Sequence, residues 1–381
     1  MSAVERYLAL ALRLGRHADE LVDSYYGPEE LSRRIADEDP RDPAALAEDA
    51  DALLAELDDP WLAAQVRSLG TSARKLAGER LPYAEEVELV YGIEPRWRDE
   101  QAFADAAALL DEALPGAGDL RARYARWFGQ TVIPPDLLEQ AVRDVAEELR
   151  RLTRETVGLP DGEDFELELV AGKPWTGYAH YLGGLRTQIL LNTDLPLPAA
   201  DLVHLTAHEI YGGHHTHRVW QEVDLVRGRG QLERTLDVLW SPEAVLSEGI
   251  AQAGPMIVAG DDGQALAAEV LGRLGFDHDA ETASRVTDGR RLLVPVAANV
   301  AMLIHGRGAS RGEAREYAAT WSQLPDERVD RMVRSQLDDR SPGYQHCYWQ
   351  GLELVDAHVR GDAGRLRSLM TARVLPGDLA S

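Results

Sequence analysis

The chain has 381 residues and a formal net charge of −25, with 45% hydrophobic and 28% charged residues. This is the composition of a folded globular protein, and its acidity argues against nucleic acid or an anionic membrane surface as a partner. The single cysteine, Cys347, excludes an intramolecular disulfide and a cysteine-based zinc cluster, and it fits a reducing compartment.

Helical periodicity covers most of the chain, in segments rich in the strong helix formers alanine, leucine, glutamate and arginine. We expect helices at 3–23, 44–57, 60–78, 99–112, 136–156, 199–213, 242–258, 262–274, 279–304, 310–322, 343–359 and 362–372. The first contains a short apolar run flanked by charges and no cleavage pattern, so it predicts an amphipathic helix and not a signal peptide. No stretch approaches 18 uncharged apolar residues, so we expect a cytoplasmic protein without a membrane span.

Two short segments are typical of strands. The segment 165–172, "FELELVAG", alternates apolar and acidic residues, and 187–194, "TQILLNTD", is a short apolar run that ends in turn residues. The glycine-rich segment between them predicts a loop. The expected fold class is therefore mainly α with a small β-sheet (α+β). The best division is an N-terminal helical region, 1–118, and a catalytic region, 119–381, which together could still form one continuous domain.

Five of the eleven histidines cluster in 14 residues, and they are His204, His208, His214, His215 and His217. The stretch "HEIYGGHHTH" begins like the motif H-E-x-x-H, in which two histidines one helical turn apart bind Zn²⁺ and the glutamate takes a proton from water. Here a glycine, Gly212, stands where the second histidine belongs. The clustering favours a metal site over ordinary surface or core histidines.

Helix geometry leaves the second histidine ligand open. In a regular helix His214 would lie roughly 120° around the axis from His208, and His215 would lie on the same face but roughly 10.5 Å along it. A break or bulge at Gly212 and Gly213 would return His214 to His208, because glycine makes such departures easy. We therefore expect His208 and His214 to bind the metal, with His215 as the alternative. A pair of His204 and His208 is less favoured, since it leaves the glutamate and the glycines unused.

A third ligand is expected from the helix 242–258, "PEAVLSEGIAQAGPMIV". Glu248 lies in its otherwise apolar middle. Glu243 lies in the first turn, where a negative charge favours the helix dipole and needs no metal. We therefore predict Glu248 as the third ligand.

These segments and "PGYQHCYWQG" near the C-terminus resemble a large bacterial domain-of-unknown-function family of zinc-peptidase-like proteins. That family carries H-E-x-Y-P-G-H-H-x-Q, E-G-W-A and P-G-Q-x-x-x-Y-x-x-G in this order. The matching positions are His208, Glu209, Tyr211, Gly213, His214, His215, Glu248, Gly249, Ala251, Pro342, Gly343, Tyr348 and Gly351, with Asn192 and Thr193 at a strand end. The departures are Gly212, His217, Ile250 and Tyr344, where the family has Pro, Gln, Trp and Gln.

The resemblance covers residues from about 80 to the end and implies a helical zincin-like metallopeptidase architecture, similar to carboxypeptidases and oligopeptidases. We predict that His208, His214 and Glu248 bind Zn²⁺ with a water, and that Glu209 is the general base. Tyr348 would donate a hydrogen bond to the oxyanion, although a packed aromatic ring explains it equally well.

Four further residues are candidates for supporting the ligands or binding substrate, and they are His215, His217, Asn192 and Tyr344. The two histidines could equally be exposed helix residues, and Asn192 could simply form a turn. The strand 187–192 could pair with an extended peptide, as edge strands do, or could be an ordinary strand of the sheet.

The function that follows is a zinc-dependent hydrolase cleaving peptide or amide bonds. The alternatives are a metal-dependent hydrolase or lyase acting on a small metabolite, and a non-catalytic protein with a structural zinc. In the last case His215 or His217 would supply a fourth ligand. The sequence leaves open the substrate, the bond cleaved, cleavage at an end or in the interior, and the oligomeric state.

Overall fold

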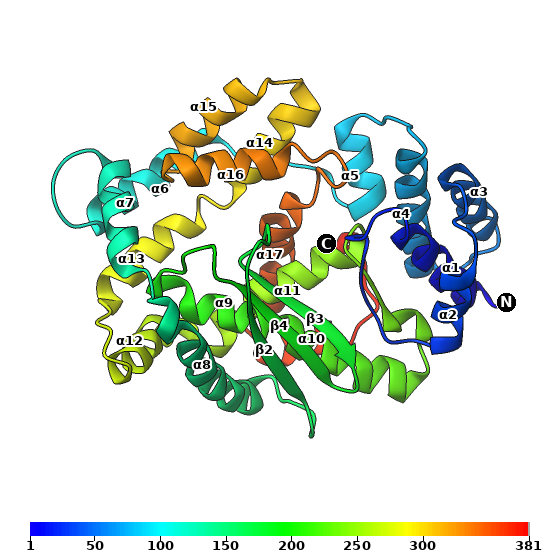
Figure 1. Ribbon diagram of the computed structural model, residues 1–381, viewed down its shortest axis with the longest axis horizontal. Helices are drawn as coiled ribbons and strands as arrows, with labels where there is room; N and C mark the ends of the chain where they lie inside the picture. The colour runs from blue at the N-terminus through cyan, green and yellow to red at the C-terminus, as the bar shows by residue number, and fades with distance from the viewer. Residues whose placement is uncertain (380–381) are drawn as a thin grey trace.

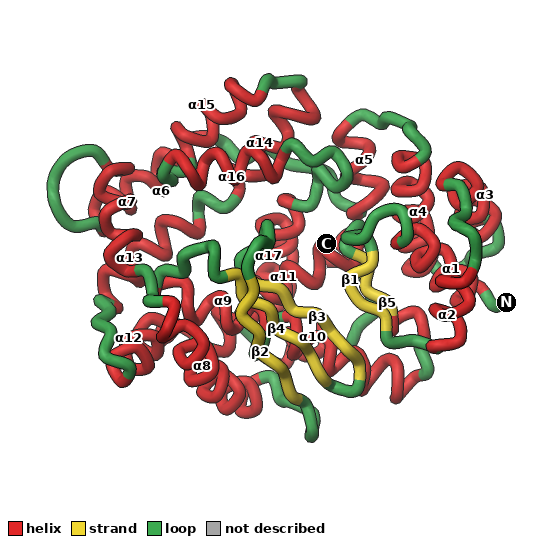
Figure 2. Tube along the Cα trace, viewed as in Figure 1, coloured by secondary structure: helices red, strands yellow, loops and turns green. Residues whose placement is uncertain are grey.

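The computed structural model describes residues 1–379, which fold mainly into α-helices (Figure 1). The strands form two small sheets, which lie near the middle of the molecule (Figure 2). The predicted class, mainly α with a small β part, is confirmed. In this described part of the chain, no helix combines the length and the apolar character needed to cross a membrane.

The N-terminal part contains five helices: α1 (Ala3–Gly15), α2 (Glu29–Asp37), α3 (Pro43–Leu54), α4 (Pro60–Leu76) and α5 (Tyr83–Tyr91). The expected helix 3–23 is wrong beyond its residue 15, because the chain turns there and forms strand β1 (Val22–Tyr25). Helices α2 and α5 were not expected. Helix α2 buries only Leu31 and Ile35, a stripe too short to stand out as periodicity.

The next segment leads into the larger sheet. It contains α6 (Glu100–Ala113), α7 (Leu120–Thr131), α8 (Pro135–Thr156), β2 (Asp164–Val170), β3 (Gly177–Gly183) and β4 (Arg186–Asn192). Strand β4 is central, parallel to β2 and antiparallel to β3. The expectation that this strand lies at an edge is therefore wrong. The predicted loop between the two strands contains β3, whose glycines stand at its two ends and whose backbone pairs with β4.

The histidine-rich segment follows the sheet. A 3₁₀ turn (Ala199–Asp201) precedes α9 (Leu202–Glu209), and α10 (His214–Trp220) continues into a π-helical turn (Gln221–Arg227). Strand β5 (Leu236–Val238) pairs antiparallel with β1 and precedes α11 (Pro242–Val258). The expected helix 199–213 is thus interrupted after residue 209, where the sequence predicted a break or a bulge.

The C-terminal helices are α12 (Gly263–Arg273), α13 (Ala280–Arg291), α14 (Pro295–Ala301), α15 (Arg311–Trp321), α16 (Asp326–Gln336), α17 (Gln345–Val359), α18 (Ala363–Met370) and α19 (Pro376–Leu379). The expected helix 279–304 is divided, because Pro295 starts a new helix at its first turn. Helices α7, α16 and α19 were not expected. Helix α16 buries just two apolar residues, Val329 and Val333.

Helix α11 lies at the centre of the molecule and is buried along nearly its whole length. Its first turns pack into the core formed by the N-terminal helices, through Ala244 and Val245. Its later turns pack into a second core, which includes the larger sheet, α8, α9 and α17. A third core joins α6 and α7 to the helices α13 to α16. Residues on α11 are therefore held from several sides.

Two glycines allow α11 and α17 to approach each other closely. A Cβ atom added to Gly249 would lie 2.4 Å from the carbonyl oxygen of Gly351. A Cβ atom added to Gly351 would lie 2.3 Å from the carbonyl oxygen of Val245. Because the obstructing atoms belong to the backbone, no side-chain rotation can make room.

We expect Gly249→Ala to lower the free energy of unfolding by about 1–3 kcal/mol, since the added methyl group overpacks the α11–α17 contact. The matched control is Gly272→Ala in α12, where an added Cβ meets no atom within 4 Å. Alanine there should stabilise the protein by about 0.5–1 kcal/mol, because it favours the helix. Urea unfolding of the three proteins measures both effects. Equal midpoints for Gly249→Ala and the wild type would contradict the close contact.

Candidate metal centre

The break between α9 and α10 has a defined backbone structure. The chain leaves the helix at Ile210 (φ −118°, ψ −95°), and Gly212 adopts a φ of +112°, which favours glycine. The side chain of Thr216 stabilises the turn, since its Oγ1 accepts a bond from the Gly212 N–H at 2.9 Å and donates one to the Ile210 carbonyl. A Cβ on Gly213 would lie 1.9 Å from the carbonyl oxygen of His208. Both glycines are therefore required for this turn.

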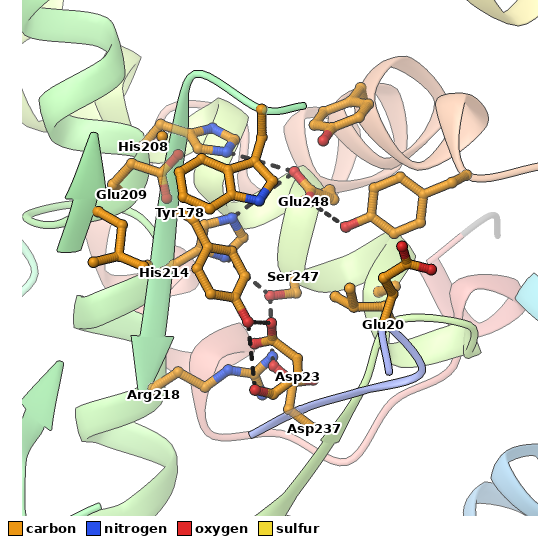
Figure 3. Close-up of a pocket in the computed structure, with 18 of the residues that line it drawn as sticks. Glu20, Asp23, Tyr178, His208, Glu209, His214, Arg218, Asp237, Ser247 and Glu248 are labelled. Atoms are coloured by element: carbon orange, nitrogen blue, oxygen red, sulfur yellow. Dashed lines mark hydrogen bonds and ion pairs between the residues drawn. The ribbon is translucent and has the colours of Figure 1, made fainter. Parts of the chain in front are cut away.

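The break brings His214 beside His208. Their ring centroids lie 4.8 Å apart and the rings are nearly perpendicular, at 88°. Glu248 on α11 faces both rings, with its Oε2 3.5 Å from His208 Nε2 and 3.9 Å from His214 Nε2 (Figure 3). One ligand atom from each of the three residues lies within 4.8 Å of the other two. The structure thus brings together the three residues that the sequence predicted as ligands.

This donor set fits a zinc ion. Zinc binds nitrogen and oxygen at about 2.0–2.2 Å, so tetrahedral ligand atoms lie roughly 3.3 Å apart, close to the two separations from Glu248 Oε2. That oxygen is buried and has no hydrogen-bond partner within the described residues. Two histidines and one glutamate are also the ligand set of several catalytic zinc sites, which keep a fourth position open.

The protonation of these groups suits a cation. Burial and the neighbouring imidazoles hold the pKa of His208 well below its usual value, and burial with the Arg218 charge lowers the pKa of His214 to about 3. Both rings are therefore neutral, as ligands must be. Burial raises the pKa of Glu248 to about 7, and burial with the Glu248 charge raises that of Glu209 to about 8. A divalent ion would reverse both shifts, because it stabilises the nearby carboxylates.

The ligands are oriented by neighbours on α11 and α17. Tyr344 donates a hydrogen bond to Glu248 Oε1 at 2.6 Å, which directs Oε2 toward the two histidines. Ser247 Oγ lies 3.3 Å from His214 Nδ1, the ring nitrogen that faces away from the carboxylate. Such contacts outside the metal ligands fix ring orientation and ligand basicity. Tyr344 was predicted as a supporting residue, whereas Ser247 was not expected.

Glu209 and Tyr348 line the cavity around the three ligands. Glu209 has only 6% of its surface exposed and faces Gly177 of β3, where an added Cβ would lie 2.8 Å from its Oε1. Tyr348 stands one helical turn after Tyr344, and the two rings meet edge to face with centroids 5.6 Å apart. Both residues are thus placed beside the candidate centre, while their chemical roles stay predictions.

His215 faces away from the centre. It is fully buried, with Nδ1 2.7 Å from Thr187 Oγ1 on β4 and Nε2 3.1 Å from Glu163 Oε2. It thereby connects α10 to the larger sheet, and the alternative of His215 as a ligand is not supported by its position. The idea that it is an exposed helix residue is also wrong.

The other candidates lie outside the cavity. His217 is buried, with Nε2 2.7 Å from the side-chain amide of Gln221, so it is no exposed helix residue either. Asn192 donates to the carbonyls of Lys173 and Trp175 and accepts from the backbone after it, which is the turn role. His204 stacks near His208 at 6.1 Å between ring centroids but is not part of the three-residue group.

The cavity has a volume of about 450 Å³, within the range of small-molecule pockets. Sequence reasoning missed most of its wall, much of which comes from β1, β3 and β5 and the segments next to them. The charged and aromatic residues missed are Asp19, Glu20, Asp23, Lys173, Trp175, Tyr178, Arg218 and Asp237. None of them belongs to a motif, and the segments that carry them are joined only by the fold.

Comparison with known proteins finds solved structures with a similar fold. No family model and no curated protein matches the chain. The crystal structure of the putative lipoprotein from Colwellia psychrerythraea is similar, with a TM-score of 0.55 and 14% identity over 88% of this chain and 65% of that one. This chain therefore spans somewhat less than two thirds of the Colwellia protein, and at this identity the likeness concerns the fold.

Two further solved structures are more distant. A putative lipoprotein of unknown function from Shewanella oneidensis has a TM-score of 0.47 and 13% identity, over 90% of this chain and 70% of that one. An M32 carboxypeptidase from Deinococcus radiodurans R1 has a TM-score of 0.41 and 13% identity, over 99% of this chain and 93% of that one.

We expect the protein to bind one Zn²⁺ per chain, and His208→Ala, His214→Ala and Glu248→Ala each to weaken that binding by at least about 100-fold. This exceeds the 10–100-fold loss typical of residues that only support a ligand. His358→Ala, at an exposed position on α17, is the control and should bind as the wild type does. Competition with a chromogenic chelator measures the affinities. Full affinity in any of the three alanine variants would remove that residue from the ligand set.

Tyr344, the residue before α17, and Tyr348 within this helix should differ in their effect on zinc affinity in the same assay. Tyr344→Phe removes the hydrogen bond to Glu248 and should weaken zinc binding by about 10–100-fold. Tyr348→Phe removes a hydroxyl that touches no predicted ligand by hydrogen bond, so its zinc affinity should stay within about twofold of the wild type. Equal losses in both variants would mean that general damage to α17, and not the hydrogen bond, causes the effect.

Proposed function

We propose that the protein is a zinc-dependent hydrolase of peptide or amide bonds. The observation that carries the proposal is the group of two neutral histidines and one carboxylate, with its unpaired oxygen, at the wall of a small-molecule-sized cavity. Zinc held there would polarise a carbonyl group and promote deprotonation of water. The resemblance of the sequence motifs to zinc-peptidase-like proteins supports the same function.

The chain's own residues have distinct roles in this proposal. Glu209 follows the ligand His208 directly and faces the cavity, so it accepts a proton from the attacking water and returns it to the leaving amine. Its burial excludes competing solvent, which strengthens its interaction with charges in the cavity. Tyr348 donates a hydrogen bond to the oxygen that develops negative charge, as an oxyanion-hole group does.

The alternative of a structural zinc is less well supported. A structural site is closed by four protein ligands. The two residues proposed as a fourth ligand, His215 and His217, are engaged by Glu163 and Gln221 and lie outside the cavity. In the described part of the chain, the group that can hold a metal has three members. This arrangement favours an open coordination position.

Strand β3 contributes more of the cavity wall than the expected β4, which contributes Leu190. Gly177, Tyr178 and Ala179 of β3 contribute to its wall, and β3 forms an edge of the larger sheet. A substrate held in the cavity therefore lies beside this strand. The rest of the cavity wall would decide whether the substrate is a peptide or another small amide.

We expect Glu209→Gln to bind Zn²⁺ within about threefold of the wild-type affinity and to lose at least about 100-fold in hydrolysis, the scale of general acid–base catalysis. The amide keeps the shape of the side chain but cannot accept the proton. The assay is release of new amino groups from a mixed peptide and acyl-amino-acid library by the zinc-loaded protein. Wild-type activity in Glu209→Gln would reject the base, and no hydrolysis by the zinc-loaded wild type would reject the proposed function.

A further inference from the structure

The cavity has two chemically different ends. The candidate metal ligands and Glu209 lie at one end, and Tyr178, Asp23, Asp237 and Arg218 gather at the other, with Ser247 between them (Figure 3). Tyr178 donates a hydrogen bond to Asp23, and Arg218 pairs with Asp237. The second end is not needed for the hydrolytic chemistry proposed above.

The second end holds two carboxylates and one basic side chain. Asp23 lies beside Asp237, and burial with the charge of Asp237 raises the pKa of Asp23 to about 7, because the Tyr178 hydroxyl and the single cation Arg218 offset this only in part. The guanidinium of Arg218 is already engaged by Asp237, Gln221 and Ser247. Among residues 1–379, no ion pair joins Asp23 to a basic side chain. A cation bound beside Asp23 would therefore stabilise the charged form of this carboxyl group.

Two aromatic rings in the same cavity wall also suit a cation. Trp175 and Tyr178 line the cavity and stack on each other, with ring centroids 5.3 Å apart. The faces of such rings attract ammonium groups, most strongly where water is excluded. The acidic side chains Asp19 and Glu20 extend the negative wall toward solvent, although Glu20 also pairs with Arg340.

The same cavity offers little to a carboxylate. Of its two basic residues, Arg218 is buried and fully engaged, and Lys173 is exposed on the loop between β2 and β3. A terminal carboxylate would thus find only one exposed lysine.

We propose that the substrate carries a free ammonium group, which binds beside Asp23 and the Trp175–Tyr178 pair, so that the protein acts on short peptides or amides with an unblocked amine. This inference rests on the proposed hydrolase function for the reaction, but the ammonium site itself does not require turnover. It makes Asp23 a specificity-determining residue. The segment 19–23, far from the motifs in sequence, then selects the substrate.

The test compares three probes on the zinc-loaded full chain: alanyl-alanine, its N-acetyl form and its C-terminal amide. We expect kcat/KM for the free dipeptide to exceed that of the N-acetyl form by at least about tenfold, and amidation to change it by less than about threefold. Asp23→Asn should abolish the preference for the free amine, mainly through KM, with unchanged zinc content. The matched control is Asp277→Asn, an exposed aspartate outside the cavity, which should behave as the wild type.

A binding measurement tests the ammonium site separately from the proposed hydrolase function. Calorimetry with Glu209→Gln, zinc-loaded, measures affinity for the same probes without turnover. Selective, Asp23-dependent binding of the free amine without hydrolysis by the wild type would retain the ammonium site and reject the hydrolase. Hydrolysis with equal or better use of the N-acetyl probe, or a preference lost in Lys173→Gln and kept in Asp23→Asn, would overturn the ammonium site. Absence of both binding and hydrolysis would overturn both proposals.

Discussion

The candidate centre depends on main-chain contacts around helix α11. Gly254 on this helix lies against the carbonyl group of Gly212 in the helix break, where an added Cβ would come within 1.9 Å. One turn earlier, Gly249 lies against the backbone of α17. Because neither contact leaves space for a side chain, three backbone segments meet at fixed separations. The histidines, the glutamate and its tyrosine partner are positioned by this packing, which is more rigid than positioning through long side chains.

This packing places polar groups where water is scarce. The centre without an ion combines two imidazoles with low pKa values, a carboxyl group with a raised pKa and an oxygen without a hydrogen-bond partner. A buried polar atom left unpaired destabilises a fold. A cation would satisfy the carboxylate oxygen and both ring nitrogens together. The same local structure that costs folding stability therefore favours a bound cation.

The sequence predicted this centre because its chemistry is local. Five histidines in a short stretch, two glycines at the place of the break and one glutamate in an apolar helix are all visible without a fold. The break also restarts the helical phase at His214, which is why His215 turns toward the sheet and Thr187. That change of direction follows from the dihedral angles of the break, which the sequence does not specify.

The sequence predicted less of the fold and of the remaining cavity wall. Long amphipathic helices were found, whereas α2 and α16 were missed because each buries only two apolar side chains in a stripe. Strand β3 was missed because its glycines indicate a loop and only pairing with β4 makes it a strand. Asp23 and Asp237 meet through the pairing of β1 with β5, a contact between distant segments. Such long-range contacts have no local signal.

The hydrogen bond from Tyr344 to Glu248 has a consequence for biosynthesis. A chain made from its N-terminus presents the two histidines and Glu248 well before α17 leaves the ribosome. Until α17 docks on the glycine face of α11, the glutamate lacks the partner that orients it. A metal ion held by these ligands would therefore meet a fully oriented carboxylate only after α17 has formed and docked.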